Sequence, residues 1–156
     1  MKKRIWFNRW FSTGIHFIDK IREGDINKEF EIFVTHHNQN REYIKRADHF
    51  SIEKVMEEKE YIEFCIGYCK ENKIDIFIPK FKLSEISRNR SKFEEIGVKV
   101  LLAAEDSIIE LVKNKSDFYE ECRKHSIVEI PEYYRVESEE ALKRAYQEMK
   151  SKNKIV

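Results

Sequence analysis

The order of apolar segments along the chain constrains its fold more than any other feature. Short, mainly apolar runs such as FEIFVT (residues 30–35) and DIFIP (75–79) alternate with longer stretches of helical period. Runs of this kind are typical of strands that are covered on both faces, as in a parallel sheet. Strands that alternate with helices pair in parallel through right-handed crossovers. The sequence therefore predicts an α/β fold: a Rossmann-like open parallel sheet of about five strands with helices on both faces, plus C-terminal linker helices.

The elements that we expect follow one another regularly. We expect strands over residues 4–7, 30–35, 48–52, 75–79 and 98–103. We expect helices over residues 15–22, 57–72, 83–96, 107–124 and 138–150. Glycines follow two of these helices, a proline ends the fourth strand, and Ser138 is a suitable cap for the last helix. The segment 36–47 is polar and then partly helical, and 125–136 is extended.

Composition narrows the function classes. A chain of 156 residues with 41% hydrophobic residues can form one ordinary domain, or one domain and a piece of another. Its 30 basic and 29 acidic residues nearly cancel, so the net charge gives no reason to expect a surface that binds nucleic acid or a membrane. It contains no apolar run long enough to span a membrane, and we expect no signal peptide. Cys65, Cys69 and Cys122 have no metal or redox spacing, so we expect buried free thiols and a reducing, cytoplasmic location.

Candidate ligand-binding loops follow the expected strands, because open α/β sheets bind ligands beyond the carboxyl ends of their strands. These loops cover residues 8–14, 36–39, 79–82 and 104–106. The first loop has Gly14 but lacks the G-x-G-x-x-G pattern of dinucleotide sites. His36 and His37 are adjacent, so on a strand they would point to opposite sides and would not form a metal pair. No Walker loop, nucleophile elbow or paired-carboxylate motif is visible, and these turns predict no catalytic residue.

The first loop offers two alternatives. Ser12, Thr13 and Gly14 begin a helix, and its bare backbone N–H groups would favour a carboxylate or a phosphate. Alternatively, Ser12 or Thr13 caps the helix through its side chain. Trp10 and Phe11 would either line a pocket or pack against a neighbouring domain.

The second half of the chain resembles the entry to the ATP-grasp enzymes. In that superfamily, the last parallel strand of an N-terminal domain leads to a helix. An Asp-Lys or similar pair then starts a helix with an aromatic residue near its first turn, and a proline-containing stretch and a further helix follow. The corresponding pieces here are Asn114-Lys115, Phe118-Tyr119, Ile127 with Pro131, Tyr134 to Val136, and the helix opened by Ser138. Asn114 departs from the usual acidic residue. The STGIHFIDKIREGD turn and the DIFIP strand resemble the pre-ATP-grasp domain of carbamoyl-phosphate-synthetase-like members.

This resemblance implies that residues 1–112 form a pre-ATP-grasp domain and that residues 113–156 begin an ATP-grasp domain. It implies the substrate-cleft domain of an ATP-dependent carboxylate–amine ligase, which uses ATP and magnesium and forms an acyl phosphate. Lys115 would contact ATP, while Trp10, Ser12, Thr13 and Gly14 would contact a small-molecule carboxylate substrate.

The last residues, NKIV, would begin the next strand of an ATP-grasp domain. On that resemblance, the second nucleotide lysine, the glycine-rich loop and the magnesium ligands would follow beyond Val156. We therefore expect a truncated piece that is inactive alone and needs a C-terminal catalytic domain as partner. The sequence leaves the oligomeric state open, a homodimer included.

Two rival interpretations share the same sheet. One is a stand-alone flavodoxin-like or receiver-like binding or regulatory module. A receiver needs an acidic cluster after its first strand, where this chain has Asn8 and Arg9. The other is the N-terminal half of a nucleotide-sugar or glycosyltransferase-like protein, which predicts no ATP-grasp linker between Lys115 and Val136.

Overall fold

The structure, a computed structural model, describes residues 2–126 and 128–152. The chain divides into two compact units, Met1–Glu110 and Leu111–Val156. Ile127, which belongs to the ATP-grasp resemblance, lies outside the described residues. So do Ile155 and Val156, where we expected a further strand to begin.

The first unit contains a five-stranded parallel sheet, which confirms the predicted fold class. The strand order is β3-β2-β1-β4-β5, and every neighbouring pair is parallel. The strands are β1 (Lys3–Asn8), β2 (Phe30–His36), β3 (His49–Ile52), β4 (Ile76–Pro79) and β5 (Lys99–Val100). At the carboxyl end of the central strand, Asn8 is in register with Thr35 on one side and with Pro79 on the other.

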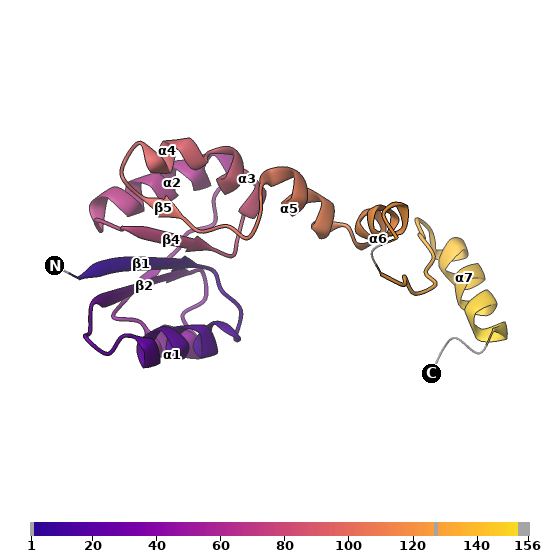
Figure 1. The fold of residues 1–156 in the computed structure, drawn as a ribbon, viewed down its shortest axis with the longest axis horizontal. Coiled ribbons are helices and arrows are strands. Elements are labelled where there is room, and N and C mark those ends of the chain that lie inside the picture. The colour runs from indigo at the N-terminus through magenta and orange to yellow at the C-terminus, as the bar shows by residue number, and fades with distance from the viewer. Residues whose placement is uncertain (1, 127, 153–156) are drawn as a thin grey trace. The chain divides into compact units, whose positions relative to one another are not determined.

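Helices cover both faces of the sheet, as Figure 1 shows. One face carries α1 (Gly14–Gly24) and the short 3-10 helix η1 (Glu42–Arg46), and the other carries α2 (Glu58–Glu71), α3 (Leu83–Arg88) and α4 (Arg90–Glu94). The core is divided accordingly. Because side chains alternate along β1, Ile5 and Phe7 pack with Ile18 of α1, whereas Trp6 packs in the opposite layer.

Two expected helices are each interrupted by an asparagine. The stretch expected as one helix over 83–96 forms α3 and α4, and the stretch 107–124 forms α5 (Asp106–Lys113) and α6 (Lys115–Lys124). Asn89 Nδ2 donates to the Glu85 carbonyl at 2.8 Å, and Asn114 Oδ1 accepts from the Ser116 N–H at 3.1 Å. Asparagine side chains compete in this way for backbone groups, so the single-helix expectations were wrong.

The last strand is shorter than expected. Residues 98–103 were predicted as a strand, but β5 includes only Lys99 and Val100. The Leu101 N–H still donates to the Phe77 carbonyl at 2.8 Å. Pro79, the last residue of β4, has no N–H with which to continue the ladder, and this explains why the pairing ends.

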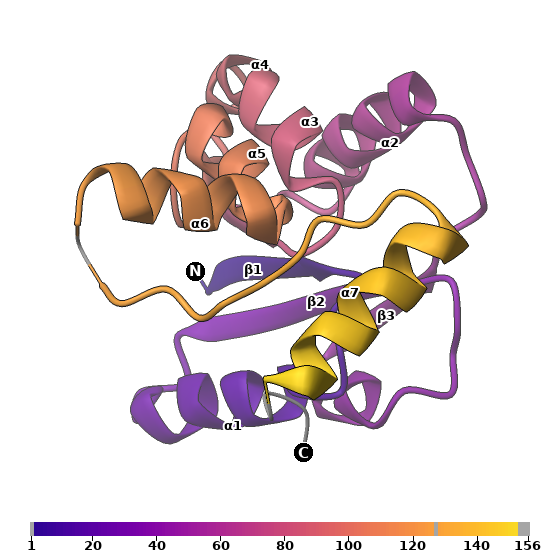
Figure 2. The same ribbon diagram turned by 90° about the vertical axis from the view of Figure 1, so that its right-hand side faces the viewer.

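The second unit consists of α6 and α7 (Glu139–Ser151) with an extended segment before α7 (Figure 2). Lys152 Nζ donates to Glu132 at 2.6 Å and to the Tyr134 hydroxyl at 3.1 Å, which fastens this segment to the end of α7. The Tyr133 hydroxyl donates to the Ser116 carbonyl at 3.3 Å and fastens the same segment to α6.

The three cysteines are free and buried, which confirms their predicted burial. Burial raises the pKa of the Cys69 thiol to about 12, so this group is an unreactive thiol at neutral pH. Within the described part of the chain, no helix combines the length and the apolar character that crossing a membrane requires.

Candidate functional site

The sheet has a topological switch point at the carboxyl ends of β1 and β4. The chain runs outward from β1 to β2 and β3, and then returns to the other side of β1 to form β4. Open α/β sheets bind ligands in the crevice at such a point. The loops that leave β1 and β4, residues 9–13 and 80–82, therefore delimit the candidate site.

Asn8, the last residue of β1, connects the two loops through hydrogen bonds of its side chain. Its side chain is fully buried, and its Oδ1 accepts from the Lys80 N–H at 2.7 Å. Its Nδ2 donates to the Phe81 carbonyl at 3.2 Å and to the Tyr61 hydroxyl at 2.9 Å. A single amide thus joins β1, the loop after β4, and α2.

Glu53 carries a buried charge beside Asn8. Its side chain is 0% exposed, and its Oε1 accepts from the Thr35 hydroxyl at 2.6 Å and from the Tyr61 hydroxyl at 3.3 Å. Its Oε2 pairs with Arg9 Nε. The Thr35 hydroxyl also accepts from Trp6 Nε1 at 3.0 Å. A buried carboxylate is tolerated when it is paired and hydrogen-bonded, and Glu53 meets both conditions.

Arg9 occupies an unusual backbone conformation at the rim of this network. Its φ is 39°, in the left-handed region, which costs a non-glycine residue about 1–2 kcal/mol. Its guanidinium carbon lies 4.3 Å from the centre of the Phe81 ring, and Nη2 donates to the Lys54 carbonyl at 3.3 Å. The ion pair with Glu53 and the ring contact hold the side chain in place, with 15% of its surface exposed.

The structure places Trp10 and Gly14 in the core and leaves Ser12 and Thr13 exposed. Trp10 Nε1 donates to the Ile78 carbonyl at 3.3 Å. A Cβ on Gly14 would lie 3.1 Å from Cε3 of the Trp10 ring, so the absence of a side chain allows the helix to approach the indole. Trp10 and Thr13 also line a shallow hollow of about 450 Å³ together with His16, Phe17, Lys20 and Lys80.

The first turn of α1 has fewer bare N–H groups than the sequence suggested. The Gly14 N–H donates to the Phe11 carbonyl at 2.9 Å, and the Ile15 N–H donates to the Ser12 carbonyl at 3.3 Å. Thr13 occupies the N-cap position, but its side chain makes no capping hydrogen bond. The capping alternative is therefore wrong for Thr13, and anion binding at this turn stays a prediction.

His36 and His37 do not point to opposite sides as expected, because β2 ends at His36 and the alternation ends with it. Their rings stack with centroids 4.3 Å apart. His36 is buried, and its Nδ1 accepts from the Asn38 N–H at 2.8 Å. Burial and the neighbouring His37 lower the pKa of His36. Within residues 2–126 and 128–152, no three His, Cys, Asp or Glu side chains converge as a metal site.

Lys115 is exposed at the first turn of α6, in the second unit. Asn114 caps this helix, and its Oδ1 also accepts from the Ser116 hydroxyl at 2.7 Å. An exposed lysine at a helix start has the charge and the reach to contact a phosphate. Its contact with ATP nevertheless stays a prediction.

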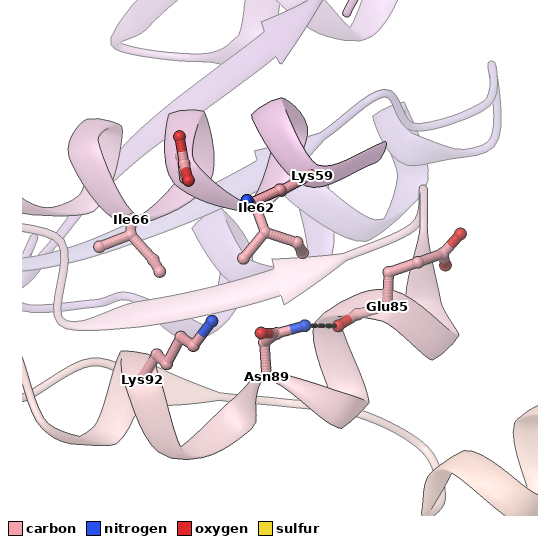
Figure 3. A pocket seen from close by; sticks show the side chains of 7 residues that line it. Lys59, Ile62, Ile66, Glu85, Asn89 and Lys92 are labelled. Atoms are coloured by element: carbon pink, nitrogen blue, oxygen red, sulfur yellow. Dashed lines mark hydrogen bonds between the residues drawn. The ribbon is translucent and has the colours of Figure 1, made fainter. Parts of the chain in front are cut away.

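A second hollow, of about 460 Å³, lies between α2 and the α3–α4 pair (Figure 3). Ile62 and Ile66 form one wall, and Asn89 and Lys92 lie opposite. None of its lining residues belongs to a loop that directly follows a strand. The switch point of the sheet is therefore a better candidate for a ligand site than this second hollow.

Three residues of the polar network at the switch point, Glu53, Thr35 and Tyr61, were not among the residues predicted from the sequence to form a site. Glu53 directly follows the third strand, as Arg9 directly follows the first. A charged residue at the carboxyl end of a strand was the available signal for it. Its burial could not be read from that position, because it depends on partners up to 44 residues away.

The comparisons with known proteins agree with this architecture. A family model described as "PylC-like, N-terminal domain" matches residues 16–101, more than half of the chain. A search of curated protein sequences gave no match.

Solved structures share the fold at low sequence identity. The N5-carboxyaminoimidazole synthetase from Staphylococcus aureus, complexed with ADP, is 12% identical over 94% of this chain and 36% of its own, with a TM-score of 0.60. The biotin carboxylase domain dimer of the Hydrogenobacter thermophilus 2-oxoglutarate carboxylase, with MgADP, ADP and bicarbonate, is 18% identical over 96% of this chain and 33% of its own, with a TM-score of 0.57. The chain thus spans about a third of the length of these proteins.

Proposed function

The chain belongs to the family of PylC-like N-terminal domains, and on this basis we propose that it forms the substrate-cleft domain of an ATP-dependent carboxylate–amine ligase. In the proposed reaction, the substrate carboxylate attacks the γ-phosphorus of ATP, ADP leaves, and an acyl phosphate forms. An amine then attacks the acyl carbon, and phosphate leaves. The observation that carries the proposal is the polar network at the switch point. The family match covers β2 to β5, which include the two strands on either side of β1.

The residues of this chain would position the substrate. Asn8 fixes the two loops at the crevice, and Arg9 supplies a cation there. We propose that Ser12 and Thr13, which are exposed, contact the substrate and that Trp10 forms a wall of the cleft. Gly14 would act indirectly, because it is buried against the Trp10 ring.

We also propose that residues 1–112 are the pre-ATP-grasp domain and that residues 113–156 begin the ATP-grasp domain, in which Lys115 would contact ATP. ATP supplies the phosphoryl group when bound. On the ATP-grasp resemblance, the magnesium ligands would come from the catalytic core of the ATP-grasp domain. A carbamoyl-phosphate-synthetase-like arrangement, a cytoplasmic location and a homodimer belong to the same proposal. One support for the last is that the related biotin carboxylase domain is a dimer.

Trapping the acyl phosphate tests the proposed activity. The longest protein that the gene encodes is incubated with MgATP, hydroxylamine and a panel of carboxylates. We expect a hydroxamate that requires both ATP and one carboxylate, and none from residues 1–156 alone. A reading frame that supplies no ATP-grasp core, together with no hydroxamate from any carboxylate, would favour the stand-alone binding module.

Nucleotide affinity tests Lys115 separately. In the same full-length protein, we expect Lys115→Ala to weaken ATP binding about tenfold, since a charge-assisted contact to phosphate is lost. Lys124→Ala removes an exposed lysine from the other end of α6 and is the matched control, with unchanged affinity expected. Equal affinities in the two variants would overturn the assignment of Lys115.

A further inference from the structure

We infer that Arg9, held in place by Glu53, is the anion receptor of the cleft and binds the carboxylate of the substrate. This inference rests on the proposed ligase function. It moves the anion contact from the first turn of α1 to a side chain at the end of β1.

The donors of Arg9 are only partly used inside the protein. A guanidinium has five N–H groups. Within the described residues, Nε donates to Glu53 and Nη2 donates to the Lys54 carbonyl. Two rings lie against the guanidinium: its carbon is 4.3 Å from the centre of the Phe81 ring and 5.4 Å from the centre of the Tyr61 ring. The remaining donors belong to a side chain that keeps 15% of its surface exposed at the switch point.

Glu53 makes this arginine rigid. Its carboxylate is fully buried and receives two hydroxyl hydrogen bonds on the oxygen that does not face Arg9. The carboxylate therefore has a fixed orientation, and it fixes the guanidinium plane in turn. A guanidinium that is already held in one orientation loses little conformational freedom when its N–H groups bind an oxyanion, which favours affinity.

The guanidinium of Arg9 is suited to ligands that carry a carboxylate or a phosphoryl group. Arginine binds carboxylate and phosphoryl groups through paired N–H donors, and such charge-assisted bonds are about twice as strong as neutral ones. Lys80, in the loop after β4, carries a further positive charge, and its Nζ lies 5.3 Å from the Trp10 ring in the hollow beside α1. A carboxylate of the substrate and a phosphoryl group of ATP share this chemistry, and we assign the site to the carboxylate.

The opposite edge of the sheet supplies a matched control. At the amino end of β1, Arg4 Nε pairs with Glu31 at 2.9 Å, Nη1 donates to the Asn72 carbonyl at 2.8 Å, and the guanidinium lies 5.7 Å from the Phe33 ring centre. Arg4 thus repeats every type of contact that Arg9 makes. It differs in lying away from the carboxyl edge, where no ligand crevice is expected.

Nuclear magnetic resonance on the unmodified 156-residue chain tests the inference directly. The arginine Nε–Hε signals and the backbone amides are followed during titrations with succinate, inorganic phosphate and, at equal ionic strength, sodium chloride. We expect succinate to shift the Arg9 signal and the amides of residues 9–13 and 80–82 saturably, with the Arg4 signal unmoved. No saturable shift at Arg9, or a tighter response to phosphate than to succinate, would overturn the assignment.

Variants add a second measurement. Arg9→Lys keeps the positive charge but removes the paired N–H donors of the guanidinium, so we expect it to weaken succinate binding about tenfold. We expect Arg4→Lys to leave succinate binding unchanged. We expect Glu53→Gln to weaken binding as well, because the guanidinium of Arg9 loses its fixed orientation. Thermal unfolding of each variant shows whether it is folded at the titration temperature, and the wild-type titration stands if one is not. Equal succinate affinity in Arg9→Lys and wild type would overturn the inference.

The hydroxamate assay separates this inference from the proposed function. If the full-length enzyme forms a hydroxamate, we expect Arg9→Lys to raise KM for the carboxylate about tenfold with kcat nearly unchanged. An unchanged KM would overturn the role of Arg9 and leave the ligase function standing. Succinate binding at Arg9 without any hydroxamate would overturn the ligase function, and with it the assignment of a ligase substrate to this site.

Discussion

The Thr35 hydroxyl joins the Trp6 indole to the Glu53 carboxylate through a single buried atom. It accepts from Trp6 Nε1 at 3.0 Å and donates to Glu53 at 2.6 Å. Thr35→Val preserves the shape but leaves a buried indole N–H and a buried carboxylate oxygen each short of a partner. We expect it to lower the free energy of unfolding by about 2 kcal/mol in urea titrations. Thr13→Val, at an exposed position, should change it by less than about 0.5 kcal/mol. A smaller effect at Thr35 than at Thr13 would contradict the network.

His36 gives the stability a predictable dependence on pH. Burial and His37 lower its pKa, with Arg41 and Arg9 adding repulsion, so the folded state binds its proton less readily than the unfolded state does. Its contribution to stability is full above the unfolded pKa of about 6.5 and is lost as pH falls through the folded pKa. We expect His36→Gln to lose less stability than wild type between pH 7.5 and 5.5 in urea titrations. His16→Gln, on exposed α1 surface, should follow wild type, and identical slopes in all three proteins would refute the assignment to His36.

Single residues at the site were only partly predictable. The sequence placed Asn8 and Arg9 directly after the first strand, and the structure gives both of them roles at the switch point. It could not reveal Glu53 as their buried counterpart, because that role depends on tertiary packing. Gly14 was interpreted as part of a binding turn, whereas the structure shows it pressed against Trp10.

Among the helices, α6 begins after Asn114, which lies inside the helix expected over residues 107–124 but which the ATP-grasp resemblance placed in a pair that starts a helix. Asn114 Oδ1 accepts from the N–H groups of Ser116 at 3.1 Å and Asp117 at 3.5 Å. We expect Asn114→Ala to reduce the stability of α6 by about 1 kcal/mol, measured as faster hydrogen exchange in its first turns. Asn114→Asp should restore protection, since a carboxylate caps equally well and favours the positive end of the helix. Unprotected amides in Asn114→Asp would show that the amide group is needed.

Element order was predictable from the sequence, whereas some element boundaries were not. Four of the strands and the parallel pairing follow from apolar runs that alternate with helices, whereas the expected third strand, DHFSI, is not an apolar run. The apolar periodicity did not reveal the helix breaks at Asn89 and Asn114, because the helical period continues across both residues. The end of β5 depends on Pro79 in its neighbour β4, and a strand taken alone contains no such information.

For the molecule as a whole, fold and function came from different kinds of evidence. The layered sheet follows from physical pattern in residues 1–110, and the family match spans its central part. The proposed ligase function rests on a resemblance in the order of segments, since the sequence contains no catalytic motif. The structure adds what neither could supply, which is the buried network that links Arg9, Glu53 and Asn8 at one edge of the sheet.

The division of the chain into two units predicts that the first folds without the second. Both buried clusters around the sheet draw their buried residues from Ile5 to Val100, and the pairing of the five strands lies within residues 3–101. We therefore expect a fragment of residues 1–112 to retain a cooperative urea transition with a midpoint close to that of the whole chain. Its amide spectrum should overlay that of the 156-residue chain for residues 2–105, with changes confined to α5, whose last residue is removed.

A matched fragment of residues 1–97 removes β5 while keeping α4, and it should lose cooperative unfolding, because Val100 and the pairing of β5 with β4 belong to the buried sheet. If residues 1–112 unfold like residues 1–97, the first unit depends on contacts with the second. The boundary at residue 112 would then be wrong, although the assignment of Arg9 to the cleft would be unaffected, since its partners all lie before residue 82.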